Sequence, residues 1–201
     1  MKLILGNLEN YHQNLEIVSP NEIMSNDEFF EFCQKNSIFK FERDFEKNII
    51  VLPKSGGIKG KRNSEINTEL NLWSEKFDGN VFASSTAFIF PNGATRSPDA
   101  AWVSDELWNT LTDEEQDKFP KISPEFVVEL MSPSDKLKDA KLKMLEYIEN
   151  GVELAWLINP SDEEVHIFRA DGTISKVNGF DNILSGESIL KDFEFQLNLL
   201  R

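Results

Sequence analysis

The sequence predicts one α/β domain, a sandwich in which a mixed central sheet is flanked by helices. The elements expected between about residues 60 and 159 follow the order helix, three strands, helix, strand, or αβββαβ, which is typical of such sandwiches. The segment FVVELM (126–131) is an almost continuous apolar run, as expected for a central strand covered on both faces. A chain of 201 residues with 40% hydrophobic residues can bury one core of this kind.

The N-terminal part of the chain is expected to precede the sandwich. Residues 1–24 have no clear periodicity and are interpreted as an extension, followed by a single domain over residues 25–201. Ser25 and, three positions later, Glu28 form a capping-box pattern. This pattern predicts a short helix to about Lys35.

A β-hairpin is predicted next. The alternation in SIFKFERD (37–44) and the apolar run in KNIIVLP (47–53) predict its two strands, which turn near residues 45–47. Glu42, on the first of these strands, is expected to face solvent or to lie behind a functional site.

The first core helix is predicted from the 60s to about residue 77. Its apolar stripe, at helical spacing, consists of Ile66, Leu70, Trp73 and Phe77. The preceding KSGGIKGKR (54–62) is expected to be a flexible basic loop, and its glycine spacing matches neither a Walker motif nor a dinucleotide-binding fingerprint. An ordinary solvated loop and a loop that contacts a DNA backbone both remain open.

Strands are then predicted over residues 81–89 and 99–103, with a hairpin turn at Asn92-Gly93 between them. An acidic helical excursion over 105–121 leads into the apolar strand. A second core helix is expected from about Asp135 to Asn150, and it stops at Gly151, a typical C-terminal glycine. The remaining elements are a buried strand in ELAWLIN (153–159) and a C-terminal β-meander, and Ser132 and Ser134 are interpreted as an N-cap device for the second helix.

Composition restricts the chemistry. With two histidines and one cysteine, Cys33, the chain has little material for a histidine-rich zinc site or a Ser-His-Asp triad, and Cys33 is interpreted as a structural thiol. The net charge of −14 argues against a nucleic-acid partner, although net charge concerns solubility and long-range association and not a local site. No apolar run is long enough to span a membrane and the first six residues are too short for a signal peptide, so a cytoplasmic protein is expected.

Two carboxylates stand out. Glu129 interrupts the apolar strand, and a buried carboxylate normally requires a cation, a metal ion or several hydrogen-bond donors beside it. Asp99 follows Pro98 and opens the neighbouring strand. A salt-bridged Glu129 and an ordinary turn aspartate are the structural alternatives. Two carboxylates from adjacent strands can hold Mg²⁺, which keeps several waters and takes one or two carboxylates.

These residues resemble a known family. RSPDAAWVS (96–104), FVVELMSPSD (126–135), KMLEYIENGVELAWLINP (143–160) and the FERDFEKNIIVLP hairpin look like the Uma2 family, or DUF820, of restriction-endonuclease-like proteins. The resemblance implies a PD-(D/E)xK nuclease fold with Asp99 and Glu129 as its acids. That pattern has a lysine two positions after the second acid, where this chain has Met131.

The resemblance implies that a lysine on the following helix, Lys143, replaces the missing one. Lys141 is a rival because it falls within the predicted core stripe of that helix, whereas Lys143 lies at its flank. A plain helical ion pair is the alternative role for Lys143. The fold type also adds an acid from the first core helix, for which Glu65 is chosen over Glu69.

The resulting expectation is an endonuclease that hydrolyses DNA with Mg²⁺, for which Mn²⁺ can substitute, held by Asp99, Glu129 and Glu65 with Lys143 as the catalytic lysine. A homodimer is expected, because two copies could gather their basic residues in one cleft. Two alternatives stay open. One is a catalytically inactive nuclease-fold module that binds protein or nucleic acid, and the other is a metal-dependent hydrolase of another substrate.

Overall fold

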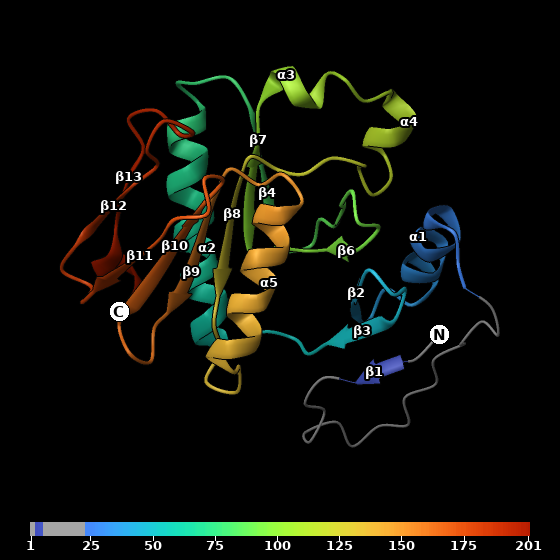
Figure 1. The fold of residues 1–201 in the computed structure, drawn as a ribbon, viewed down its shortest axis with the longest axis horizontal. Helices are drawn as coiled ribbons and strands as arrows, with labels where there is room; N and C mark the ends of the chain where they lie inside the picture. Colours follow the sequence, from blue (N-terminus) through green and yellow to red (C-terminus); the bar gives the residue numbers. More distant parts are fainter. Residues whose placement is uncertain (1–2, 6–22) are drawn as a thin grey trace.

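The protein is an α/β sandwich in which a six-stranded mixed sheet carries α2 on one face and α5 on the other (Figure 1). The computed structural model describes residues 3–5 and 23–201. Its helices are α1 (Asn26–Lys35), α2 (Gly57–Ser74), α3 (Asp105–Trp108), α4 (Asp113–Gln116) and α5 (Leu137–Glu149), followed by a 3-10 turn at Leu197–Leu200. Among the described residues, no helix is long and apolar enough to cross a membrane.

The six-stranded sheet has the order β11-β10-β9-β8-β7-β4. Its strands are β4 (Asn80–Ala83), β7 (Ala100–Val103), β8 (Phe126–Leu130), β9 (Leu154–Asn159), β10 (Glu164–Arg169) and β11 (Ile174–Asn178). β8 and β9 are parallel because α5 crosses over between them, and the other neighbours are antiparallel. The predicted αβββαβ order with a mixed sheet is therefore confirmed.

A second sheet, of order β1-β3-β2-β6-β5, lies beside the first. Its strands are β1 (Leu3–Leu5), β2 (Lys40–Arg43), β3 (Ile49–Leu52), β5 (Phe88–Ile89) and β6 (Thr95–Arg96), while β12 (Ile183–Ser185) and β13 (Glu194–Gln196) form a small third sheet. The predicted β2–β3 hairpin is confirmed. The predicted extension over 1–24 contains β1, but most of it lies outside the described residues.

The single strand predicted over residues 81–89 is wrong. β4 pairs with β7 in the large sheet, whereas β5 pairs with β6 in the second sheet. The Ser97 hydroxyl lies 2.8 Å from the carbonyl oxygen of Ser84 and 2.9 Å from that of Thr86, which holds the chain in a turn between the two strands. The hairpin turn predicted at Asn92-Gly93 is confirmed, with Gly93 at φ +85°.

Two apolar clusters cover the two faces of the large sheet. One joins α2 and the C-terminal segment to the sheet, and the other joins it to α5. Alternate residues of β8 enter the two clusters, with Val128 on the α2 side and Val127 on the α5 side. Glu129 lies two positions after Val127 and therefore on the α5 side.

Two helix starts differ from the predictions. The segment predicted as a flexible basic loop is helical from Gly57 onward, after Gly56 as an extended N-cap residue, so Lys59 belongs to the first turns of α2. The predicted capping by Ser132 and Ser134 is also wrong, because the N-cap residue of α5 is Lys136. Asp135 instead accepts a 2.7 Å hydrogen bond from the backbone N–H of Ser132 and closes a turn before the helix.

The Gly79 turn between α2 and β4 predicts a stability effect. Gly79 has φ +133°, and a Cβ there would lie 2.4 Å from Nε1 of Trp102. Gly79→Ala is expected to lower the free energy of unfolding, measured in urea, by about 3 kcal/mol, because it adds a steric clash to an unfavourable backbone conformation. Gly172→Ala is the control, since Gly172 has φ +81° and open space around it, and only about 1 kcal/mol should be lost. Equal losses would contradict the role of the Trp102 contact.

Candidate functional site

The candidate site lies where β7 begins and β8 ends, beside the N-terminal end of α2 and the middle of α5 (Figure 1). Asp99 directly precedes β7, and its backbone N–H donates to the carbonyl oxygen of Val128 at 3.0 Å. Glu129 is the fourth residue of β8. The antiparallel pairing of β7 with β8 therefore brings the two acids to one end of the sheet.

The carboxylate of Asp99 is buried, at 4% exposure, and accepts three contacts. Its Oδ2 accepts the backbone N–H of Leu130 at 2.8 Å and lies 3.0 Å from Nζ of Lys59. Its Oδ1 accepts Nδ2 of Asn63 at 3.0 Å. One residue from β8 and two from α2 thus fix the orientation of this carboxylate.

Two side chains of α5 bind the carboxylate of Glu129. Nζ of Lys143 lies 2.7 Å from its Oε1, and the hydroxyl of Tyr147 donates to the same atom at 2.7 Å. Lys143 and Tyr147 are one helical turn apart and so project from the same side of α5. Both contacts use Oε1, and no hydrogen bond from residues 23–201 reaches Oε2 of Glu129.

Lys143 is also paired with the hairpin sheet. Its Nζ lies 2.9 Å from Oε1 of Glu42, which is only 2% exposed. The prediction that Glu42 faces solvent is therefore wrong, and the alternative, that it lies behind the site, fits its position. Glu42 also accepts the backbone N–H of Ser97 at 3.0 Å and lies 3.3 Å from NH1 of Arg96.

The charges around Lys143 set the protonation of the site. Burial alone would raise the pKa of Glu42, but the adjacent Lys143 and Arg96 lower it to about 2. Burial raises the pKa of Glu129, although Lys143 opposes this shift. For Lys143, burial would lower the pKa, and the two carboxylates Glu129 and Glu42 reverse this and raise it. Lys143 is therefore held as an ammonium ion between two acids.

A further lysine, Lys40, lies close to the acids of the site. Nζ of Lys40, at the start of β2, donates to the carbonyl oxygen of Ser97 at 3.1 Å. Burial lowers the pKa of Lys40, while the nearby Glu42 raises it. The three acids of the site, Glu42, Asp99 and Glu129, are thus surrounded by four cations, Lys40, Lys59, Arg96 and Lys143.

The structure distinguishes between the two candidate lysines. Lys143 contacts Glu129, whereas the charge of Lys141 acts on Glu164 and His166 at the start of β10. Met131, where the usual lysine of the nuclease pattern would lie, is buried at 8% exposure in the cluster under α5. A lysine at that position would have to replace a core side chain.

Glu65 does not lie on the face of α2 that contacts Asp99. The face of α2 that contacts Asp99 carries Lys59, Asn63 and Asn67, which are spaced by four residues. Glu65 lies two positions after Asn63, about 200° around the helix, and within the described chain no hydrogen bond or ion pair joins it to Asp99 or Glu129. The position expected for Glu65 is occupied by Asn63.

Sequence reasoning missed five contributors: Lys40, Lys59, Asn63, Asn67 and Arg96. Asn63 and Lys59 share a helical spacing with each other, and this signal became visible only once α2 was known to begin at Gly57. Arg96 lies three positions before Asp99 and pairs with Glu146 of α5 at 2.7 Å as well as with Glu42. The RSPD sequence thus contributes a cation and an acid to the same site.

The site offers oxygen atoms for a hard cation. No group of three or more His, Cys, Asp or Glu side chains within the described residues is arranged to hold a metal ion. However, Glu129 has an unoccupied Oε2, and the buried Oδ1 atoms of Asn63 and Asn67 accept no hydrogen bond from the residues that the structure describes. The chemistry of these oxygens fits Mg²⁺, which takes few carboxylates and otherwise accepts amide oxygens and water.

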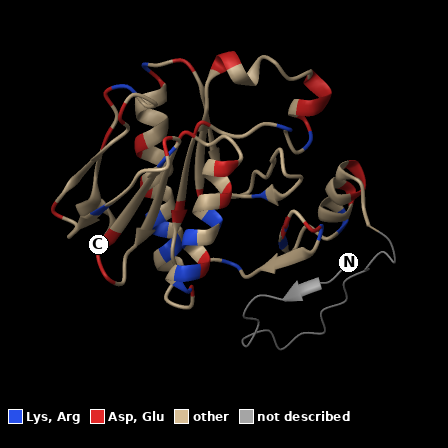
Figure 2. Cartoon of the chain, viewed as in Figure 1, with Lys and Arg blue, Asp and Glu red and all other residues tan. Residues whose placement is uncertain are grey.

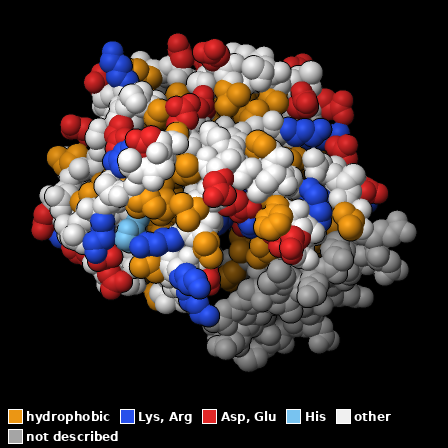
Figure 3. Space-filling view, viewed as in Figure 1, with side chains coloured by type: hydrophobic (Ala, Val, Ile, Leu, Met, Phe, Trp, Pro, Cys, Tyr) orange, Lys and Arg blue, Asp and Glu red, His pale blue; other side chains and the backbone are white. Residues whose placement is uncertain are grey.

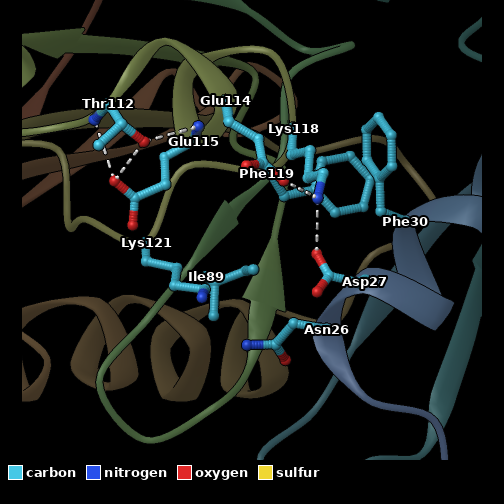
Figure 4. Close-up of a pocket in the computed structure, with 10 residues that line it drawn as sticks. All are labelled: Asn26, Asp27, Phe30, Ile89, Thr112, Glu114, Glu115, Lys118, Phe119 and Lys121. Carbon is cyan, nitrogen blue, oxygen red and sulfur yellow. Dashed lines mark hydrogen bonds and ion pairs between the residues drawn. The ribbon is translucent and has the colours of Figure 1, made fainter.

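A separate hollow lies between α1 and α4 (Figure 4). Its volume is about 300 Å³, and its wall contains none of the residues around Asp99 and Glu129. Lys118 crosses it, 3.2 Å from Asp27 of α1 and 2.8 Å from Glu114 of α4. These ion pairs join α4 to α1, and the hollow is not part of the candidate site.

Fold and site together define a restriction-endonuclease-like α/β protein with two acids at the ends of neighbouring strands. The chain belongs to the Uma2 family, whose model, described as "Putative restriction endonuclease", matches residues 26–199. Its fold is similar to the crystal structure of a putative nuclease belonging to DUF820 from Anabaena variabilis ATCC 29413, with a TM-score of 0.71 at 19% sequence identity over 88% of this chain and 97% of that chain. No curated protein matches the chain.

The depressed pKa of Glu42 predicts a pH-dependent effect on stability. Glu42 stays ionised in the folded protein down to about pH 2, whereas an unfolded glutamate titrates near 4.3. The contribution of ionised Glu42 to the free energy of unfolding is therefore fully present above about pH 5 and is lost as the pH falls towards 2. Glu42→Gln is expected to lower the free energy of unfolding by about 3 kcal/mol at pH 7 and by much less at pH 2.5.

Urea denaturation at several pH values measures this difference. Glu149→Gln, which removes an exposed carboxyl at the end of α5, should change stability by less than about 0.5 kcal/mol at every pH. An equal loss for Glu42→Gln at pH 7 and pH 2.5 would show that the charge of Glu42 is not responsible.

Proposed function

We propose that this protein is a magnesium-dependent endonuclease that hydrolyses phosphodiester bonds of DNA at Asp99 and Glu129, with Lys143 as its lysine. One observation carries the proposal: Nζ of Lys143 lies 2.7 Å from Glu129. The acid and lysine of a nuclease site are therefore adjacent, although Met131 stands where the usual lysine would be. The family to which the chain belongs, described as a restriction endonuclease, supports the same activity.

Asp99 and Oε2 of Glu129 would hold Mg²⁺, with Mn²⁺ as a substitute, and the amide oxygen of Asn63 is better placed than Glu65 to join them. When bound, such a cation supplies Lewis-acid polarisation of the phosphate and lowers the pKa of a bound water. Lys143 stays protonated between its two carboxylates, so it does not accept the proton of that water. It instead orients the water and stabilises the negative charge that develops on the phosphate.

The distribution of charge favours a polyanionic substrate despite the net charge of −14. Eight of the 21 lysines and arginines lie in two short segments, 54–62 and 136–143: Lys54, Lys59, Lys61, Arg62, Lys136, Lys138, Lys141 and Lys143. These segments include the N-terminal turns of α2 and α5, where basic residues gather in Figure 2, whereas acidic residues mark α3 and α4 at the other end. The locally positive end is the one that contains the acids of the site.

The space-filling view shows the same separation of basic and acidic side chains. Basic side chains gather over the lower part of the face in Figure 3, and acidic side chains border its upper edge. A duplex approaching the lower end would meet cations first, and phosphate contacts of this kind supply most of the affinity of non-specific DNA binding.

A catalytically inactive binding module is the second candidate. Each acid of the site already has a cationic partner without any metal ion. No metal ion is therefore needed to neutralise these carboxylates. Calorimetric titration with Mn²⁺ distinguishes the two candidates. Binding that is lost in Asp99→Asn favours the nuclease, and absence of binding favours the module.

Isosteric substitutions test the catalytic assignment. Asp99→Asn and Glu129→Gln should abolish Mg²⁺-dependent cleavage of plasmid DNA, and Lys143→Met should reduce its rate by about 100-fold or more, because a charge stabiliser of the transition state is lost. Circular dichroism should show a folded protein in each case. Parallel assays on RNA and on small phosphodiesters identify the preferred substrate.

Lys141→Met is the matched control, because Lys141 lies on the same helix but faces β10. Loss of this one basic residue affects DNA affinity and not the chemical step, so the cleavage rate at saturating DNA should stay within about threefold of that of the unchanged protein. Unchanged cleavage by Asp99→Asn, or an equal loss in Lys141→Met and Lys143→Met, would contradict the assignment.

A further inference from the structure

The carboxylate of Asp99 already has three close donors, and one of them is a cation. Its two carboxylate oxygens already receive the N–H of Leu130, the amide of Asn63 and the ammonium of Lys59, at 2.8, 3.0 and 3.0 Å. Three donors use most of the four or so lone-pair sites of a carboxylate, and the positive charge of a nearby ammonium repels a metal ion. A metal ion therefore binds Asp99 more tightly if the ammonium withdraws.

Lys59 is the donor that can withdraw. The N–H of Leu130 belongs to β8, which is paired with β9, and Asn63 lies well inside α2. Lys59 is in the first turn of α2, and its side chain is 24% exposed, against 6% for that of Asp99. It has a flexible four-carbon stem with a strongly hydrated charge.

The surroundings of Lys59 also allow it to move. Gly56, Gly57 and Gly60 flank it, and a Cβ built at any of these three positions would have no neighbour within 4 Å. The first turn of α2 is therefore uncrowded, and no side-chain cap holds its start. Withdrawal of Lys59 breaks one ion pair and leaves the sheet unchanged.

We propose that Lys59 is an exchangeable counter-ion, which neutralises Asp99 in the metal-free protein and moves to a phosphate of the bound nucleic acid when a divalent cation takes its place. This inference rests on the proposed function. The ammonium that leaves Asp99 stays on a helix end next to the scissile position, among the basic residues of the segment 54–62. Metal binding and substrate binding are thereby coupled through one side chain.

Metal affinity gives the first test. Titration calorimetry with Mn²⁺ is carried out on the unchanged protein, Lys59→Met, Lys61→Met and Asp99→Asn. Lys59→Met removes the competing charge while keeping the length of the stem, so its affinity for Mn²⁺ should be about tenfold higher. Lys61→Met is the control, because Lys61 is exposed and lies about 200° from Lys59 around the helix, and its affinity should be unchanged.

DNA binding gives the second test, with Ca²⁺ as the divalent cation. In the unchanged protein and in Lys61→Met, the slope of log affinity against log salt should become steeper by about 0.9 when Ca²⁺ replaces EDTA, because one phosphate contact is gained. In Lys59→Met this increase should be absent.

The outcomes separate the two proposals. Binding of Mn²⁺ that is lost in Asp99→Asn but is equal in Lys59→Met and the unchanged protein overturns the role of Lys59 and leaves the metal site intact. Weaker binding in Lys59→Met overturns it as well. Absence of Mn²⁺ binding in every variant, including Lys59→Met, overturns both the metal site and the exchange.

Discussion

The site depends on one partly buried ammonium ion, that of Lys143. Lys143, on α5, lies between Glu129 of the large sheet and Glu42 of the hairpin sheet. Desolvation of the ammonium and of both carboxylates is costly, and only their close mutual contact compensates for it. Removal of Lys143 would leave Glu129 without an ion-pair partner among the described residues, with only the hydroxyl of Tyr147 donating to it. The position of α5 relative to both sheets is thus constrained by electrostatics as well as by apolar packing.

The distribution of charge around the site explains how an acidic chain can have a basic end. The overall charge of −14 is carried largely by residues distant from the site, such as those of α3 and α4 (Figure 2). Inside the site, acids and bases are almost balanced, and the surrounding rim is basic. The total charge of a chain therefore says little about the potential at one end of it.

Much of the fold follows from local patterns in the sequence. The capping box at Ser25, the turn at Asn92-Gly93 and the apolar strand around Glu129 each depend on neighbouring residues, and all three are present in the structure. The assignment of the chain to Uma2 also followed from short motifs in the right order. Local patterns are reliable where few distant contacts compete with them.

The remaining features depend on contacts between distant residues. The glycines at 56, 57 and 60 predict a loop, but the chain is helical there and presents Lys59 to Asp99. Glu42 looks like a surface residue of a hairpin until Lys143, 101 positions away, is placed against it. The division of residues 81–89 between two sheets depends on Ser97, which follows 11 residues after the nearer of its partners. Hydrophobic periodicity contains no information about such pairings.

The division between β4 and β5 has a consequence for the folding of the active protein. Because Glu42 and Arg96 come from one sheet and Glu129 from the other, neither sheet alone contains the complete set of charges. A chain with one sheet folded and the other open would have the acids and lysine of the site incorrectly paired. Under the proposed function, activity would therefore be limited to molecules in which both sheets are folded, and a partly folded chain would not cleave nucleic acid.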